Sequence, residues 1–215
     1  MAFLREDSRP VPLSAAPLFA GPVLLGAFLM LLVLLPGQAQ AHHLMHLLHL
    51  QPTPLSGLIS GLAHPVLGPD HLLFLVALSL VGLRHRSRWM LGLLVTGLAG
   101  SLLGLVLPGL PGAEALVSFT LVLVALVLSG RLDQRLLIPA FGLHGYVLSA
   151  SVLGWSAGPI AAYLVGLVLS QGALLLLALQ GLRGLTGRLS SLSLRSLAAA
   201  LLGCGAAWTW SALVG

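Results

Sequence analysis

The sequence contains a series of long apolar runs that are separated by short connections. Six of them follow residue 55, at approximately 56–83, 89–107, 113–130, 136–154, 159–182 and 196–213. Each run is close to the roughly 20 residues that an α-helix needs to cross a bilayer. Only 7% of the residues are charged and 58% are hydrophobic, whereas soluble domains carry roughly 25% charged residues. The sequence therefore predicts an all-α integral membrane protein with six transmembrane helices in the mature chain.

Residues 1–41 have the organisation of a signal peptide. Arg5 and Arg9 precede an apolar core at about 18–35, and a small-residue Ala-Gln-Ala motif ends at Ala41. Because the apolar core is long for a signal peptide, the alternative is an uncleaved leader helix. In both cases we expect this segment to precede the six-helix domain.

The segment that would begin the mature chain, residues 42–55, is rich in histidine. Its first histidines, His42, His43 and His46, lie close to the amino group that cleavage would create. Imidazole binds borderline divalent cations, so this segment could capture a metal ion. The alternative is an interfacial segment whose leucines contact lipid headgroups. We expect an extracytoplasmic segment, followed by a membrane domain at 56–215.

The arginines of the membrane domain alternate between connections. The connections after the second and fourth runs contain no basic residue, whereas the other three hold Arg84, Arg86, Arg88, Arg131, Arg135, Arg183, Arg188 and Arg195. Basic loops stay in the cytoplasm, so the pattern predicts a multi-pass protein of the plasma (inner) membrane with both mature termini outside. The arginines of these connections explain the net charge of +5. The sequence has no stripe of basic residues interleaved with aromatic residues, so we expect no nucleic-acid partner.

One motif concentrates the ionisable groups of the apolar runs. His64, Asp70 and His71 lie in a stretch of eight residues inside the first run. Inserting a carboxylate at such a position in a membrane costs about 2.5–3.5 kcal/mol on insertion scales. The helix-breaking residues between the histidines are Pro65, Gly68 and Pro69. Broken helices inside membranes line polar cavities, and imidazole with carboxylate suits Ni²⁺, Co²⁺ or Zn²⁺. The motif predicts a metal-ion site where the first transmembrane helix is broken.

The fourth run carries a further intramembrane histidine, His144. The adjacent Gly145 could admit another helix or an ion, and Tyr146, Ser149 and Ser151 could supply hydrogen bonds to the imidazole. The alternative is a histidine that only forms a hydrogen bond between helices. Because other candidate ligands lie at similar depth, we expect His144 to be a metal ligand or relay.

The segment from His64-Pro65 to Asp70-His71, of the form HPxxGxDH, resembles the signature of the HupE/UreJ family of nickel and cobalt permeases. The segment Leu143-His144-Gly145-Tyr146 is similar to the second motif of that family, and a mature chain that begins with histidine resembles its cyanobacterial branch. The sequence differs from the family pattern at Pro69, where a small apolar residue is usual, and at Ala150 and Ser156, where acidic residues are common.

The resemblance implies a secondary-active or facilitative transporter rather than an enzyme. It would import Ni²⁺, or Co²⁺, without an organic cofactor, and the resemblance places His64, Asp70, His71 and His144 on the path of the ion. The metal ion and the bilayer are the expected partners, and a homo-oligomer or a downstream metallochaperone stays open.

Two other functions compete with transport. A non-transporting membrane subunit could hold a metal or haem for the assembly of a metalloenzyme, since two histidines on facing helices can ligate haem. An intramembrane zinc hydrolase is disfavoured because the sequence has no HExxH motif. The sequence also lacks a phosphate-binding GxxxxGK[ST] motif, so the transport hypothesis needs an ion gradient, the membrane potential or cytoplasmic trapping of the ion.

Overall fold

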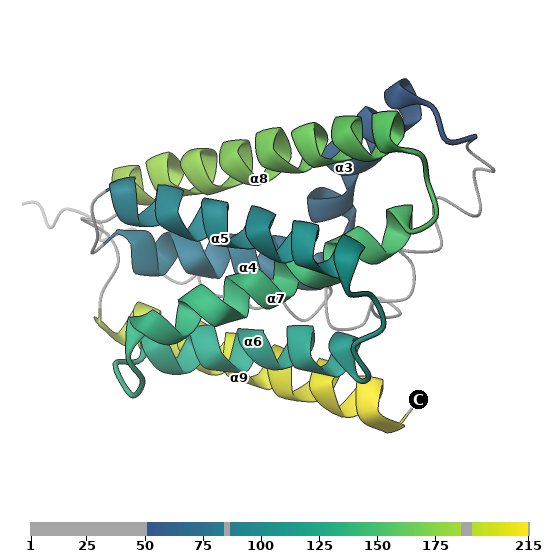
Figure 1. Ribbon diagram of the computed structural model, residues 1–215. Helices are drawn as coiled ribbons and strands as arrows, with labels where there is room; N and C mark the ends of the chain where they lie inside the picture. The colour runs from purple at the N-terminus through teal and green to yellow at the C-terminus, as the bar shows by residue number, and fades with distance from the viewer. Residues whose placement is uncertain (1–50, 84–86, 186–190, 215) are drawn as a thin grey trace, which may run out of the picture.

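The computed structural model of the protein describes residues 51–83, 87–185 and 191–214, which form a bundle of helices (Figure 1). These residues contain no strand. Their α-helices are α3 (Pro54–Leu67), α4 (Pro69–Gly82), α5 (Ser87–Val106), α6 (Ala113–Leu128), α7 (Leu137–Leu148), α8 (Ala157–Leu185) and α9 (Ser191–Val214), and two 3₁₀ segments, η1 (Gln134–Leu136) and η2 (Ser149–Val152), flank α7. The predicted all-helical fold is confirmed for this part of the chain. The predicted leader and His42, His43 and His46 lie outside it.

The helices differ in whether they are long enough to cross a membrane. By length and composition, three stretches qualify, Arg88–Val106, Ala157–Arg183 and Leu194–Val214, and α3 with α4 makes a fourth if the bent pair is one span. The α6 and α7 helices have 16 and 12 residues, which at 1.5 Å per residue is about 24 and 18 Å. The hydrocarbon core is about 30 Å thick. The count of six spans therefore stays a prediction.

The α7 helix is short because the backbone tightens into η2 at its end. The hydroxyl of Ser149 donates to the carbonyl oxygen of Tyr146 at 2.6 Å, and that of Ser151 donates to the carbonyl oxygen of Leu148 at 3.1 Å. Such local hydrogen bonds from serine side chains compete with the helical pattern of the backbone.

Three pairs of helices pack closely, α3 with α8, α5 with α7, and α6 with α9. At each interface a glycine lies where a Cβ would overlap the neighbouring backbone: Gly61 against Tyr163, Gly100 against Gly142, and Gly205 against Val122. Small residues allow helix backbones to approach in this way, which is how helices associate in membranes.

The α3 and α4 helices meet at Gly68 with a bend of 71°. Pro69 has no N–H to donate to the carbonyl of Pro65, and it disfavours the helical conformation of the preceding residue. Gly68 is accordingly extended, with φ −83° and ψ 107°. The amide of Gly68 still donates to His64 at 3.1 Å, and the amide of Leu72 donates to Gly68 at 2.9 Å to begin α4. The predicted break of the first run is confirmed at Gly68 and Pro69, whereas Pro65 lies inside α3 and does not end it.

The connections divide between the two ends of the bundle (Figure 1). The α6–α7 connection, the start of α5, the end of α8 and the start of α9 lie at the left of the view, and the α5–α6 and α7–α8 connections lie at the right with the C-terminal end of α9. The described helix ends that adjoin the arginine-containing connections are thus grouped at one end, as the alternation of basic residues requires.

Candidate metal-binding site

The first turn of α4 places two ionisable side chains inside the bundle. Asp70 and His71 are 4% and 3% exposed. A carboxylate in the first turn of a helix is favoured by the helix dipole. A Cβ on Gly68 would lie 2.6 Å from Cδ2 of His71. Since the φ angle of Gly68 is ordinary, the glycine is needed here for space, because the imidazole of His71 lies over the break.

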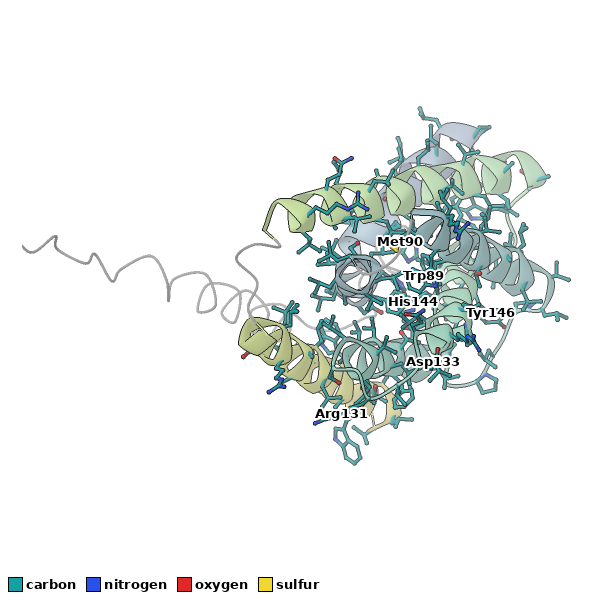
Figure 2. The ribbon with its side chains drawn as sticks, turned by 90° about the vertical axis from the view of Figure 1, so that its left-hand side faces the viewer. Trp89, Met90, Arg131, Asp133, His144 and Tyr146 are labelled. Atoms are coloured by element: carbon teal, nitrogen blue, oxygen red, sulfur yellow. The ribbon has the colours of Figure 1, made fainter. Side chains whose placement is uncertain are left out.

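Three imidazoles from three helices form a row. The ring centroids of His64 on α3 and His71 on α4 are 5.6 Å apart, and those of His71 and His144 on α7 are 5.2 Å apart. All three side chains are buried. Figure 2 shows His144 between the helices, whereas Arg131 lies at the edge of the bundle. We call His64, His71 and His144 the histidine row.

The imidazole of His144 is held from two sides. It stacks on the ring of Phe74, with the centroids 3.8 Å apart and an angle of 15° between the planes. Its Nδ1 atom lies 3.1 Å from the hydroxyl oxygen of Thr120 and 3.4 Å from the carbonyl oxygen of Ala140. Both contacts are made by Nδ1, and neither involves Nε2 on the other side of the ring.

The expected hydrogen bonds from Tyr146, Ser149 and Ser151 to His144 were wrong. The hydroxyl of Tyr146 donates to the carbonyl oxygen of Leu107 at 2.6 Å, because a residue two positions along a helix points away from its neighbour. Ser149 donates to the backbone of Tyr146. The hydroxyl of Ser151 donates to the backbone of Leu148 and lies 3.4 Å from Nδ1 of His64, a different imidazole. The adjacent Gly145 admits a helix, since a Cβ there would overlap the backbone of α5.

The imidazole of His64 is held by α8 and η2. Its Nδ1 atom lies 3.0 Å from the hydroxyl oxygen of Tyr163 and 3.4 Å from that of Ser151. The Tyr163 hydroxyl in turn donates to the carbonyl oxygen of Leu148 at 2.5 Å. Tyr163 is fully buried, so this contact joins α3 to α8 inside the bundle.

Sequence reasoning missed the roles of Thr120, Tyr163 and Phe74. Thr120 and Tyr163 are polar residues inside apolar runs, and a buried hydroxyl needs a hydrogen-bond partner. That signal could have identified them as contacts of buried histidines. Phe74 carries no such signal, because an aromatic residue in an apolar run is ordinary.

Two nitrogen atoms of the histidine row are buried without a hydrogen-bond partner among the described residues, Nδ1 of His71 and Nε2 of His144. Leaving a buried polar atom unsatisfied costs about 1–3 kcal/mol, and imidazole nitrogens are common ligands of transition metals. In the described residues, no group of three or more His, Cys, Asp or Glu side chains is already arranged to hold an ion. Ligation by three of these side chains would therefore require them to move closer together.

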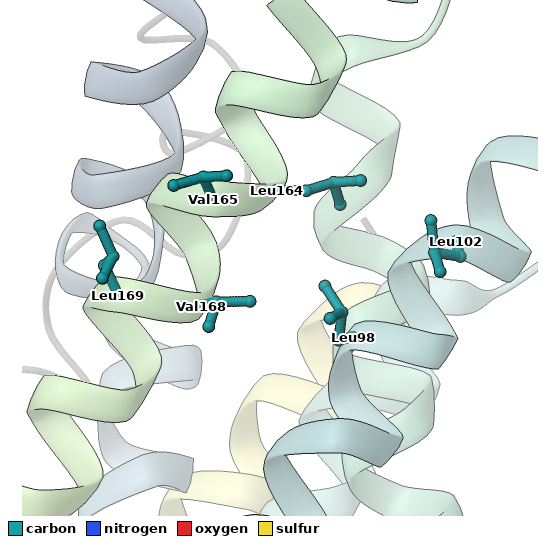
Figure 3. Close-up of a pocket in the computed structure, with 6 residues that line it drawn as sticks. All are labelled: Leu98, Leu102, Leu164, Val165, Val168 and Leu169. Atoms are coloured by element: carbon teal, nitrogen blue, oxygen red, sulfur yellow. The ribbon is translucent and has the colours of Figure 1, made fainter.

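A separate pocket of about 270 Å³ lies between α5 and α8 (Figure 3). It is lined by Leu98, Leu102, Leu164, Val165, Val168 and Leu169. These aliphatic side chains carry no atom that can ligate a cation. We therefore do not include this pocket in the candidate site.

A family model described as HupE / UreJ protein matches residues 29–208. The match includes the break at Gly68 and all three members of the histidine row. No curated protein and no solved structure matches the chain.

Proposed function

The chain belongs to the HupE/UreJ family, and from this premise we propose that it is a transporter that imports Ni²⁺, with Co²⁺ as the alternative cargo. The family is associated with nickel and cobalt transport. The observation that carries the proposal is the histidine row, three buried imidazoles next to a buried carboxylate at a broken helix. A non-transporting subunit for metalloenzyme assembly is the less favoured function.

The donor set supports a borderline divalent ion. His64, His71 and His144 supply neutral imidazoles and Asp70 supplies one carboxylate, a combination that suits Ni²⁺ or Co²⁺ better than Mg²⁺ or Ca²⁺. With a divalent ion and a single carboxylate, the site would carry a net charge of about +1. An uncompensated charge favours release, which transport needs as much as binding.

The ion would reach this site from outside the cell. In the proposal, His42, His43 and His46 capture it near the membrane surface, and it then passes to the histidine row. The grouping, at one end of the bundle, of the helix ends that adjoin the arginine-containing connections supports a cytoplasmic location for that end. Both mature termini would then face the outside of the plasma membrane. A gradient, the membrane potential or cytoplasmic trapping would drive secondary-active or facilitative import.

Radioactive Ni²⁺ uptake by cells that express the wild-type chain tests this function, with Co²⁺, Zn²⁺ and Cu²⁺ as competitors. The decisive variant is Asp70→Asn, which removes the carboxylate charge and keeps the shape of the side chain. Asp133→Asn is the matched control, because Asp133 is exposed in the α6–α7 connection and its side chain accepts a hydrogen bond from the amide of Arg135 at 2.7 Å, which asparagine can also accept. We expect uptake to be lost in Asp70→Asn and kept in Asp133→Asn at equal membrane abundance.

Two results would contradict the proposal. Wild-type uptake equal to that of empty cells, over several metals and pH values, would remove transport and favour a metal-holding subunit. Full uptake by Asp70→Asn would show that the ion does not depend on the carboxylate at the helix break.

A further inference from the structure

The two outer imidazoles of the histidine row share one arrangement. In each, Nδ1 contacts a hydroxyl oxygen whose own proton is directed to a backbone carbonyl. This matters because a neutral imidazole carries its single proton on either Nδ1 or Nε2, and only the nitrogen without the proton can ligate a metal.

At His64 the hydroxyl belongs to Tyr163. The oxygen of Tyr163 lies 2.5 Å from the carbonyl oxygen of Leu148, and two oxygens approach this closely only when a proton lies between them. The single hydroxyl proton is thus used, and the tyrosine oxygen can only accept from Nδ1 of His64, 3.0 Å away. The hydroxyl oxygen of Ser151 lies 3.4 Å from the same Nδ1, but its proton is directed to closer oxygens, those of Leu148 and Tyr163, each 3.1 Å away. Nδ1 therefore faces acceptors and carries the proton, which leaves the lone pair of the ring on Nε2.

At His144 the hydroxyl belongs to Thr120. Its oxygen lies 2.5 Å from the carbonyl oxygen of Val117, so its proton is used in the same way, and the oxygen accepts from Nδ1 of His144 at 3.1 Å. The carbonyl oxygen of Ala140, 3.4 Å from Nδ1, can also only accept. Two acceptors therefore face Nδ1, and the lone pair is again on Nε2, which is buried without a hydrogen-bond partner among the described residues.

We propose that Tyr163 and Thr120 are positioning residues that hold His64 and His144 in the Nδ1–H tautomer, so that both bind the ion through Nε2. Histidines that ligate metals generally donate their other ring N–H to an acceptor, which sets the tautomer and the ring orientation. The assignment of the tautomers stands on the hydrogen bonds alone. Their use in metal binding rests on the function proposed above.

Nitrogen-15 NMR of the full chain, labelled at histidine and free of metal, measures the tautomers directly. Spectra at about pH 8, where imidazole is neutral, separate protonated from unprotonated ring nitrogens. We expect two buried histidines of the wild-type chain to be Nδ1–H tautomers. Tyr163→Phe should shift only the signals of His64 toward the Nε2–H tautomer, and Thr120→Val only those of His144.

The controls separate the tautomer from other effects of these substitutions. Thr120→Ser keeps the hydroxyl and should keep the wild-type signals. Tyr146→Phe removes a tyrosine hydroxyl that binds the backbone near Leu107, and Thr209→Val removes a threonine hydroxyl that donates to the carbonyl of Gly205. Both should leave the two histidines unchanged.

The same variants are then tested for Ni²⁺ affinity in detergent. We expect Tyr163→Phe and Thr120→Val to weaken binding by about 10- to 100-fold, the range for groups that orient metal ligands, and Thr120→Ser to restore it. Wild-type His64 or His144 in the Nε2–H form would overturn the proposal without any variant. Unchanged tautomers in Tyr163→Phe and Thr120→Val would also overturn it.

This experiment distinguishes the two proposals. If the tautomers are as expected and the cells take up no metal, the proposed transport function is wrong, while the role of Tyr163 and Thr120 in setting the tautomers stands. If the cells take up Ni²⁺ and the tautomers are the opposite ones, the positioning role fails and transport stands.

Discussion

The imidazole of His144 stacks on the phenyl ring of Phe74, with their centroids 3.8 Å apart. Phe74 lies one turn after His71 on α4, and the ring of His71 contacts the same imidazole edge-on at 5.2 Å. One turn of α4 thus orients His144 from two directions. Because α4 begins at the break after Gly68, the geometry of the break determines where His71 and Phe74 lie. Through these two rings it also affects the orientation of the imidazole of His144.

Gly68→Ala should weaken metal binding more than it weakens the fold. The new Cβ would lie 2.6 Å from Cδ2 of His71 and 3.3 Å from Oδ1 of Asp70, so both side chains must move, while the backbone conformation of Gly68 suits alanine. We expect Ni²⁺ affinity to fall about 10- to 100-fold. Binding of radioactive Ni²⁺ in detergent measures it.

Gly172→Ala is the control for this change, since its Cβ would make an ordinary contact with Leu94 at 3.6 Å. It should bind Ni²⁺ like the wild type. Wild-type affinity in Gly68→Ala would show that the imidazole of His71 need not lie over the break.

Gly145→Ala should destabilise the protein through the α5–α7 pair. A Cβ on Gly145 would overlap the carbonyl of Gly97, and overpacking of this kind costs about 1–3 kcal/mol. In contrast, Gly92 lies on an exposed face of α5 with nothing near its Cβ position. Gly92→Ala should therefore stabilise the helix by about 0.5–1 kcal/mol. Thermal unfolding in detergent compares the two, and a higher midpoint for Gly145→Ala would contradict the close packing.

The orientation of the bundle can be measured with single cysteines. We expect Leu110→Cys, in the α5–α6 connection, to react with a membrane-impermeant thiol reagent in spheroplasts. Ser129→Cys, at the end of α6, should react only after the membrane is permeabilised. Both are made in a Cys204→Ala background, since Cys204 is the single cysteine of the chain. The reverse accessibility would place the arginine-containing connections outside.

Replacing His42, His43 and His46 by glutamine should affect capture of the ion and not its passage. If these residues raise the local ion concentration, the variant should need more Ni²⁺ for half-maximal uptake and reach the same maximal rate. Initial rates over a range of Ni²⁺ concentrations separate the two parameters. A lower maximal rate with an unchanged KM would contradict a role limited to capture.

Local chemistry let the sequence by itself determine the all-helical fold, the positions of the helical segments and the break in the first run. Apolar runs predict helices because a long apolar stretch inside a bilayer has no water to bind and must satisfy its backbone hydrogen bonds internally. The break follows from Pro69, which removes a donor and restricts Gly68 whatever surrounds it. The candidate ligands were also recognisable, because ionisable groups in apolar runs are rare.

The tertiary structure alone decided which side chains meet. Thr120 and Tyr163 reach the histidines of α7 and α3 because the helices pack in particular pairs, and Tyr146 does not reach His144 because it points to another side of α7. The sequence shows that a helix is apolar on most of its surface, and such a helix has no polar face from which to infer its neighbours. Pairing depends instead on backbone contacts at positions such as Gly61 and Gly145, whose partners lie far along the chain.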